Sequence, residues 1–440
     1  MDPGPLTRHE RVAAWACALL AALTRWPALS LTLWDWDEAL FALALRDFDV
    51  SAYHPHPPGF PLFIAAAKLV PADGFHALQT IVFLSSLFVF PAMFLLARSL
   101  RASAPVAIGA GLLLAFFPNV WFYGGTALSD VPSMVLVVTA CALLLRGQVV
   151  LGAIVLGLAA GFRPQNLLIG FVPFALAFRQ RWRAGLAGAA ILAVIVGVTY
   201  GTAASLSGGW SAYRDVLATH EAYIRTTDSF LAPRHPGLIR VADDFFFRPY
   251  RAMPVNVIVT LLAAMAVLRR RQWLVIAVFG PFCLFAWLFL DFHSSSRFSI
   301  AYMPMFAMLA AAGIPRRGRE AVLVVVVALM IVWTWPALRV VHTTPSPPVA
   351  AIEALRNARG TLYVDGRLGP HADLLLPGRE RHSVRVAPPF VEDPEAVLLK
   401  EDASAAPRAR NFARPRERLE GIARKRYFET SIVFGRRPTV

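Results

Sequence analysis

Long apolar runs alternate with short polar junctions along most of the chain. The runs predict eleven helices able to cross a lipid bilayer, at about residues 11–33, 76–97, 104–118, 131–146, 148–162, 165–178, 184–206, 253–268, 273–290, 298–313 and 319–336. Several runs are shorter than the roughly 20 residues that a span needs, so tilt or local bilayer thinning must help them. The first run lacks a small-residue cleavage site and leads into an acidic stretch, so we expect it to be retained as a span.

Basic residues mark every second junction and thereby predict the orientation of the chain. They are Arg8, Arg11, Arg98, Arg101, Arg146, Arg179, Arg181, Arg183, Arg269, Arg270, Arg271, Arg316, Arg317 and Arg319. Such residues stay on the cytoplasmic side of a membrane. We therefore expect a cytoplasmic N-terminus, whereas the alternate junctions and the tail after about residue 337 face outward.

Composition excludes a soluble globular protein. Hydrophobic residues make up 57% of the 440 positions and charged residues 16%, and the mean hydropathy is +0.54. The net charge of +15 does not indicate nucleic-acid binding, because the basic residues lie in short clusters between apolar runs or in the C-terminal hundred residues. Three cysteines within apolar runs encode no disulfide framework. We expect a multi-pass protein of a bacterial inner membrane without a nucleic-acid partner, and the preference for Arg over Lys is compatible with a high-GC bacterial genome.

The first outward junction is acidic and rich in proline. The stretch "WDWDEALFALALRDFDVSAYHPHPPGFP" begins at Trp34 and holds Asp35, Asp37 and Glu38. Apolar residues at helical spacing on both sides of the prolines predict two short amphipathic helices along the membrane surface, joined by a turn. The carboxylates are then solvated at the interface and available for chemistry, or they simply cap the first of these helices.

Three further outward junctions carry charged or hydroxyl side chains. Asp130 lies in "TALSDVPSMVL", Arg163 in "GFRPQNLL", and Arg297 with Tyr302 in "LDFHSSSRFSIAYMP". Asp130 is also a good helix cap, and Arg163 an arginine that could reach lipid headgroups. Arg297, among serines, suits a phosphate. Carboxylates and hydroxyls thus gather on the outer rim, whereas the cytoplasmic rim carries mainly arginines, which indicates outward-facing chemistry.

In their order, spacing and common side, these motifs resemble the polyprenyl-phosphate-sugar-dependent glycosyltransferases of the GT-C fold. The branch with the protein O-mannosyltransferases and the bacterial aminoarabinose transferase is most similar, over about residues 10–336. The resemblance implies an all-α polytopic catalytic domain over 1–336, with about eleven transmembrane helices and surface helices in the first outer loop. The chain has Ala39, Leu40 and Phe41 where relatives often carry tyrosines, which leaves the acceptor and the sugar open.

The resemblance also implies a reaction. A sugar leaves a polyprenyl-phosphate donor on the outer face and passes, with inversion, to a protein, lipid or glycan acceptor. Asp37 would be the general base and Glu38 would orient the acceptor or Asp37. Asp130 would bind the sugar or help hold a cation, while Arg297, with Arg163 as the weaker second, would stabilise charge on the leaving phosphate.

We expect one of three roles for His54 and His56. They line the acceptor side, they join a metal site with Asp37, or they only shape the turn. Their spacing is weak for a metal, so no obligatory metal or cofactor is expected, with a divalent cation as the alternative. Tyr302 is expected to contact substrate beside Arg297.

The long outer loop 207–252 is expected to contain an amphipathic helix over the site, because Tyr213, Leu217, His220 and Ile224 recur at helical spacing. A solvated connector is the alternative.

The sequence of residues 337–440 predicts a small extracytoplasmic α/β domain. We expect a helix at 349–358, strands at "GTLYVDG", "HSVRVA" and "TSIVFG", a helical patch at "HADLLLPG" and a basic helix near "RERLEGIARKRYF". This domain contacts anionic lipid or the acceptor, or serves as a scaffold.

Two other classes of protein fit part of the pattern. A polytopic secondary transporter would also show many spans, but we find no inverted repeat of broken helices, and the charges lie on one rim rather than at mid-membrane. A non-catalytic envelope scaffold would explain the tail without explaining the carboxylate and arginine set.

Overall fold

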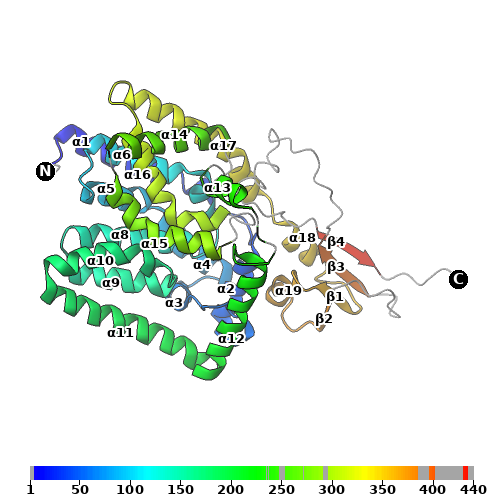
Figure 1. The fold of residues 1–440 in the computed structure, drawn as a ribbon. Helices are drawn as coiled ribbons and strands as arrows, with labels where there is room; N and C mark the ends of the chain where they lie inside the picture. The colour runs from blue at the N-terminus through cyan, green and yellow to red at the C-terminus, as the bar shows by residue number, and fades with distance from the viewer. Residues whose placement is uncertain are drawn as a thin grey trace.

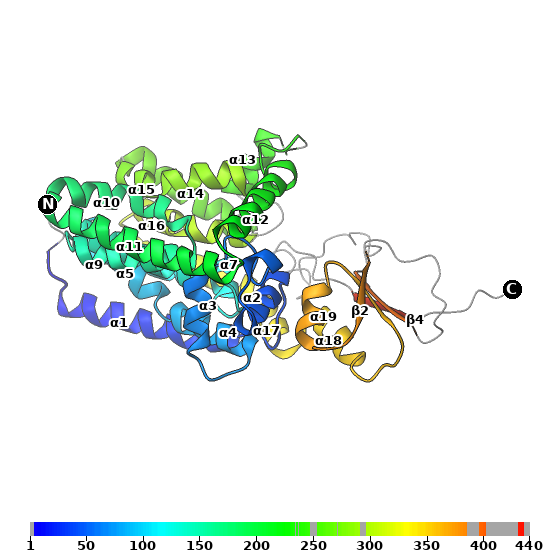
Figure 2. The ribbon, with the colours of Figure 1, turned by 90° about the horizontal axis from the view of Figure 1, so that it is seen from below.

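The structure, a computed structural model, is a helical bundle with a small α/β piece at one end (Figures 1 and 2). It describes residues 4–233, 235, 237–246, 253–270, 272–290, 296–384, 396–401 and 430–434. The coarse fold class predicted from the sequence is therefore confirmed.

The first half of the bundle is built from helices that follow the predicted apolar runs closely. They are α1 (Arg8–Leu23), α4 (Gly74–Ser86), α5 (Val89–Ser99), α6 (Ala104–Phe116), α7 (Pro118–Tyr123), α8 (Asp130–Leu145), α9 (Val149–Phe162), α10 (Asn166–Gln180) and α11 (Trp182–Leu206). α1 begins with a reciprocal cap, in which Thr7 Oγ1 accepts from Glu10 N and the Glu10 carboxylate accepts from Thr7 N.

The second half completes the bundle around α16. It consists of α12 (Trp210–Tyr223), α13 (Leu238–Phe246), α14 (Met253–Arg270), α15 (Trp273–Phe289), α16 (Met303–Gly313) and α17 (Arg319–Thr343). α16 packs against both α6 and α14, so segments about 200 residues apart in the chain share one core. The helix in the outer loop 207–252 is confirmed as α12, while residues 247–252 lie outside the described part of the chain.

Among the described residues, three helical stretches are long and apolar enough to cross a membrane by length and composition: Gly74–Ser99, Trp182–Leu206 and Arg319–Ala354. Two predicted spans are shorter than expected. α1 ends at Leu23, because Pro27 has no N–H to donate to the Leu23 carbonyl and lies in a separate 3-10 helix, Trp26–Ala28. The run 298–313 begins as a 3-10 helix (Ser296–Tyr302) and becomes α16 only at Met303. The count of eleven spans stays a prediction.

The first outer loop contains the two predicted short helices, α2 (Trp36–Arg46) and α3 (Pro61–Lys68). That these two helices lie along the membrane surface stays a prediction. The expectation that the carboxylates of this loop are solvated is wrong, since Asp35, Asp37 and Glu38 are buried. The side chains of α2 from Asp37 to Ala44 are all buried, and the helix packs against α4 and against α19 (Gly369–Leu375). Amphipathic spacing marked the helix correctly, yet could not show which distant segments pack on it.

Residues after α17 form the predicted α/β piece. α18 (Pro347–Ala354) and α19 accompany a sheet of order β2-β1-β3-β4, in which β1 is parallel to β2 and β3, and β4 is antiparallel to β3. The strands are β1 (Leu362–Asp365), β2 (Arg381–Val384), β3 (Val397–Glu401) and β4 (Thr430–Phe434). β3 was not predicted, and the predicted basic helix lies outside the described residues. α17 continues through the predicted boundary at 336/337, and the division into two domains stays a prediction.

The α/β piece is tied directly to the loop between α1 and α4. Ser346 N, which precedes α18, donates to Thr32 Oγ1 (2.9 Å), and the Arg46 guanidinium donates to the Leu374 carbonyl of α19 (3.3 Å). In the same loop, Leu31 N donates to the Val341 carbonyl of α17 (2.8 Å). The piece therefore sits on the loop that carries Asp35, Asp37 and Glu38.

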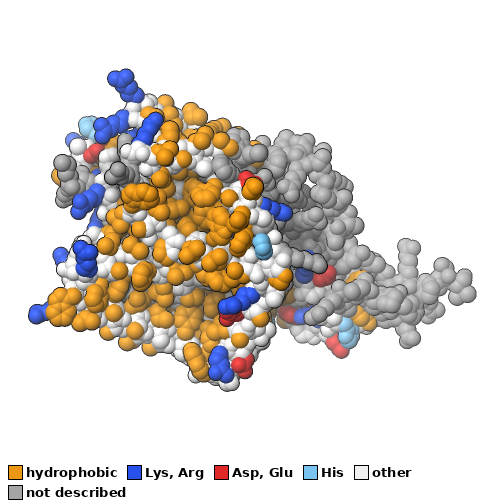
Figure 3. Space-filling view, in the orientation of Figure 1, with side chains coloured by type: hydrophobic (Ala, Val, Ile, Leu, Met, Phe, Trp, Pro, Cys, Tyr) orange, Lys and Arg blue, Asp and Glu red, His pale blue; other side chains and the backbone are white. Residues whose placement is uncertain are grey.

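The molecule has two chemically different ends. Figure 3 shows a broad hydrophobic area over the bundle, with Lys and Arg side chains gathered along the edge near the N-terminus. The α/β piece lies at the opposite end (Figure 1). The orientation that the alternate arginine junctions indicate stays a prediction.

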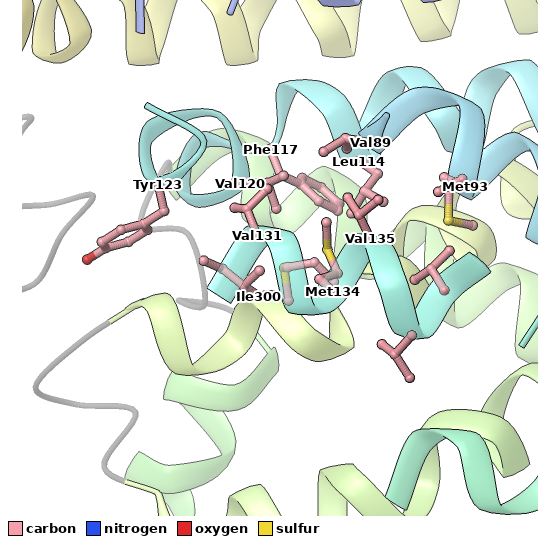
Figure 4. Packing of buried hydrophobic residues seen from close by; sticks show 14 of the residues in the cluster. Val89, Met93, Leu114, Phe117, Val120, Tyr123, Val131, Met134, Val135 and Ile300 are labelled. Atoms are coloured by element: carbon pink, nitrogen blue, oxygen red, sulfur yellow. The ribbon is translucent and has the colours of Figure 1, made fainter. Parts of the chain in front are cut away.

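The bundle core is close-packed, and one glycine allows two helix backbones to approach closely. Figure 4 shows Val89, Met93, Leu114, Phe117 and Met134 interdigitating between α5, α6 and α8. A Cβ at Gly313 would lie 1.8 Å from the Leu262 carbonyl oxygen, so α14 and α16 approach each other through this glycine.

Gly313→Ala should therefore destabilise the protein by about 1–3 kcal/mol, because the two helices must move apart. Gly197→Ala is the matched control, since a Cβ there would meet no atom within 4 Å on the exposed face of α11. The thermal midpoints of both variants in detergent check this, and an unchanged midpoint for Gly313→Ala would show that the close approach is absent.

Candidate active site

The first turn of α2 presents a cluster of carboxylates. Asp35 is the N-cap, and its Oδ1 accepts from Asp37 N at 3.0 Å. Asp37 follows in the first turn, where backbone N–H groups and the helix dipole stabilise negative charge. The capping role considered for Asp35 is thus confirmed.

Arg297 lies against this turn although it is 260 residues away in the chain. Its guanidinium is ion-paired with Asp37, and its Nη1 lies 3.9 Å from Asp35 Oδ1. The Arg297 and Asp37 side chains are 7% and 8% exposed. Burial lowers the pKa of Arg297, but Asp37, Asp35 and Asp130 together raise it well above its usual value. The guanidinium is therefore held as a cation.

Asp130 and Arg163 form a second ion pair beside the first. Arg163 Nη2 lies 2.9 Å from Asp130 Oδ2, and Arg163 Nε donates to Ser129 Oγ at 3.0 Å. The Arg163 guanidinium also lies over the Phe60 ring, 5.2 Å from its centroid. Asp130 begins α8 and Arg163 follows α9, so the outer ends of two bundle helices hold this pair. Arg163 is 17% exposed and held by the protein, unlike an arginine that reaches for lipid headgroups.

Glu38 joins two outer loops and presents no free oxygen. Its Oε2 accepts from Trp34 N (2.5 Å) and Asp35 N (2.7 Å), and its Oε1 accepts from Ala127 N (2.6 Å). The side chain is fully buried, and burial raises the pKa of Glu38 to about 7 although the backbone N–H donors oppose this. These contacts fix the loop beside Asp37, and the expectation that Glu38 orients the acceptor or Asp37 stays a prediction.

Of the two histidines in the turn, the structure places His56 next to Asp37, with His56 Nδ1 3.7 Å from Asp37 Oδ1. The His56 ring packs against Phe41 and Phe60, at centroid distances of 5.5 and 4.8 Å. Burial lowers the pKa of His56 to about 4, although the Asp37 charge opposes this. His54 lies in the turn, where its backbone exchanges hydrogen bonds with Asp49.

The 3-10 helix that carries Arg297 is held from two sides. Asn119 Nδ2 of α7 donates to Ser299 Oγ (2.8 Å) and to the Ser296 carbonyl (3.3 Å). The Tyr302 ring is buried and stacks on Phe245 of α13, with centroids 4.6 Å apart. Tyr302 thus packs behind Arg297 in the core. Sequence reasoning missed Asn119, since a single amide in an apolar run gives no signal of its partner.

α12 closes over the Pro-rich turn. Tyr213 Oη donates to the Pro58 carbonyl (2.7 Å), and Val50 N donates to Ser207 Oγ (2.9 Å). His220 of α12 lies with its ring centroid 6.4 Å from that of His56. Burial lowers the pKa of His220 and the Asp37 charge opposes this, so His220 lies within electrostatic reach of the carboxylate. Helical spacing predicted that His220 lies on the same face of this helix as Tyr213, but it did not indicate that His220 lies near Asp37.

Among the described residues, no group of three or more His, Cys, Asp and Glu side chains is arranged to hold a metal ion. Asp37 is engaged by Arg297, and Asp130 by Arg163. The expectation that no metal or cofactor is obligatory stays a prediction. Residues 291–295, with Asp291 and His293 of the last outer junction, lie outside the part that the structure describes.

No protein-family model and no curated protein sequence matches the chain. Among solved structures, the Archaeoglobus fulgidus oligosaccharyltransferase in its apo form matches with a TM-score of 0.51 and 11% identity, over 84% of this chain and 64% of that chain. ArnT from Cupriavidus metallidurans bound to undecaprenyl phosphate matches with 0.49 and 14%, over 84% and 75%. The arabinofuranosyltransferase AftD from Mycobacteria matches with 0.46 and 17%, over 83% and 30%.

The match to the oligosaccharyltransferase shows that the chain has the fold of a GT-C glycosyltransferase, as the resemblance of its motifs predicted. The chain spans about 64% of the length of that protein. At 11% identity the likeness concerns the fold alone.

The environment of His56 predicts a pH effect on stability. Because the folded-state pKa is depressed from 6.5 to about 4, the neutral ring contributes stability that is present above pH 6.5 and lost as the pH falls towards 4. His56→Phe keeps an aromatic ring but cannot ionise. Wild type should therefore lose up to about 3 kcal/mol relative to His56→Phe between pH 6.5 and 4.

Thermal midpoints of both proteins, measured in detergent across this range, check the effect. Parallel curves for the two proteins would show that His56 titrates normally.

Proposed function

We propose that the protein is an integral-membrane glycosyltransferase that moves a sugar from a polyprenyl-phosphate donor to an acceptor hydroxyl, with inversion, at the outer end of the bundle. The observation that carries this proposal is the buried contact between Asp37 and Arg297, which places a candidate base against a candidate phosphate ligand. The GT-C fold supports the same class of reaction by analogy.

Asp37 would act as the general base. The acceptor oxygen attacks the anomeric carbon, its proton passes to an Asp37 oxygen, and the bond between the anomeric carbon and the phosphate oxygen breaks. The neutral ring of His56 lies beside Asp37 and adds no second positive charge that would weaken this base. Glu38 keeps the first turn of α2 in place for this step through its three backbone contacts.

Arg297 would bind the donor phosphate. The phosphodiester gains one negative charge when it leaves as a monoester, and a preorganised guanidinium stabilises that charge without a general acid. When the phosphate binds, Arg297 would exchange Asp37 for phosphate oxygens and thereby free the carboxylate to accept a proton. Asp35 remains close enough to keep the guanidinium in position.

Asp130 and Arg163 would hold the sugar. A bonded carboxylate and guanidinium together offer acceptors and donors to sugar hydroxyls, and both lie within electrostatic reach of Arg297. Tyr302, which we expected to touch substrate, would instead support the 3-10 helix through its stacking on Phe245.

The protein would span a bacterial plasma membrane, with the arginine-rich end in the cytoplasm and the site and residues 337–440 outside. In that orientation Arg297 and Asp37 lie at the outer leaflet, where the phosphate of a lipid-linked donor would be. The α/β piece would help to hold α2 through the contact of Arg46 with Leu374.

Asp37→Asn should reduce sugar transfer by about 100-fold or more, because the amide cannot accept the acceptor proton. Asp47→Asn is the matched control, since Asp47 lies exposed at the other end of α2. Transfer of radiolabelled sugars from a panel of polyprenyl-phosphate donors is measured in membranes with equal protein levels. Equal activity of Asp37→Asn and wild type removes Asp37 from the mechanism, and a wild type silent on all donors favours a transporter or a scaffold.

A further inference from the structure

A row of ring-bearing side chains runs from the exposed side of α12 to Asp37. Tyr223 is 53% exposed, and its ring lies nearly parallel to that of His220, with centroids 6.4 Å apart. The next ring is His56, 6.4 Å from His220 and 14% exposed. Exposure therefore falls along the row, which ends at the carboxylate of Asp37.

The row is assembled from two segments that hold each other. α12 supplies Tyr223 and His220, and the Pro-rich turn supplies His56 and Tyr53, whose ring centroid lies 6.3 Å from that of His220. The hydrogen bond from Tyr213 to Pro58 fixes the helix on the turn. The rings are thus placed as a set rather than as isolated surface aromatics.

Buried polar atoms without a hydrogen-bond partner occur on His56, the inner ring of the row, and on two residues that neighbour site residues in the chain. Among the described residues they include His56 Nδ1, Trp36 Nε1 and Gln165 Oε1. Trp36 adjoins Asp37 in the chain, and Gln165 lies two residues from Arg163. A buried polar atom left without a partner destabilises the fold, so a ligand with several hydroxyl groups would relieve part of that cost.

We propose that the acceptor hydroxyl belongs to a carbohydrate, which lies along the row formed by Tyr223, His220 and His56. A sugar ring has a face of polarised C–H groups that matches the negative face of an aromatic ring, and an edge of hydroxyls that matches unpaired polar atoms. A lipid acceptor would leave those polar atoms unsatisfied. This inference rests on the proposed function, and it selects one acceptor class among protein, lipid and glycan.

The first test compares acceptor classes. Wild-type protein in nanodiscs receives a polyprenyl-phosphate sugar that supports turnover, together with three fluorescent acceptors of matched concentration: a panel of di- and trisaccharides, a serine- and threonine-containing peptide, and a long-chain alcohol. Transfer to a saccharide alone supports the inference. Transfer to the peptide or the alcohol alone overturns it while leaving the proposed function intact, whereas no release of sugar from any donor defeats the proposed function itself.

The second test locates the saccharide. His220→Ala and Tyr223→Ala should each raise the acceptor KM by about 5- to 10-fold with little change in the donor KM, because each removes one stacked ring. Tyr223→Phe keeps the ring and should recover most of the loss. Arg214→Ala, on the exposed side of the same helix, is the control. An unchanged acceptor KM in both alanine variants would show that the saccharide does not lie on this row.

Discussion

The pairing of Arg297 with Asp37 and Asp35 is the interaction on which the rest of the site depends. Removing charges from water costs several kcal/mol per ion unless partners and hydrogen bonds replace the solvent. Asp37 and Arg297 are both nearly buried, so the first turn of α2 and the 3-10 helix Ser296–Tyr302 must meet for either charge to be tolerated. The pair is thus a folding constraint that joins two distant parts of the chain.

Hydrogen bonds to backbone and amide groups hold the elements that carry this pair in place. Glu38 ties the start of α2 to Ala127, three residues before Asp130, so the two carboxylates that flank the proposed substrate are positioned by one side chain. Asn119 holds the 3-10 helix of Arg297. Such preorganisation lets the groups stabilise developing charge without rearranging during the reaction. The site therefore needs only one exchange of partners, at Arg297, to change from an ion pair to a base and a phosphate ligand.

Hydropathy and alternate arginines were sufficient to predict the helical bundle, and they placed Asp37, Asp130, Arg163 and Arg297 on one side of it. What the sequence could not show is which of these groups meet, because local spacing carries no information about partners 33 or 260 residues away. Burial was misjudged for the same reason: the carboxylates beside α2 read as solvated, but Asp35, Asp37 and Glu38 are buried and Asp37 is paired with Arg297. The sequence also gave no sign that both Glu38 oxygens accept from backbone N–H groups, and the short strand β3 lies in a stretch without alternation.

Under the proposed function, Arg297 binds the donor phosphate and releases Asp37 as the base. A cryo-EM structure of the protein in nanodiscs with a saturating polyprenyl phosphate would show this exchange. We expect phosphate density within hydrogen-bond reach of the Arg297 guanidinium, with Asp37 turned away from it. Phosphate density elsewhere, with the Arg297–Asp37 pair intact, would contradict it.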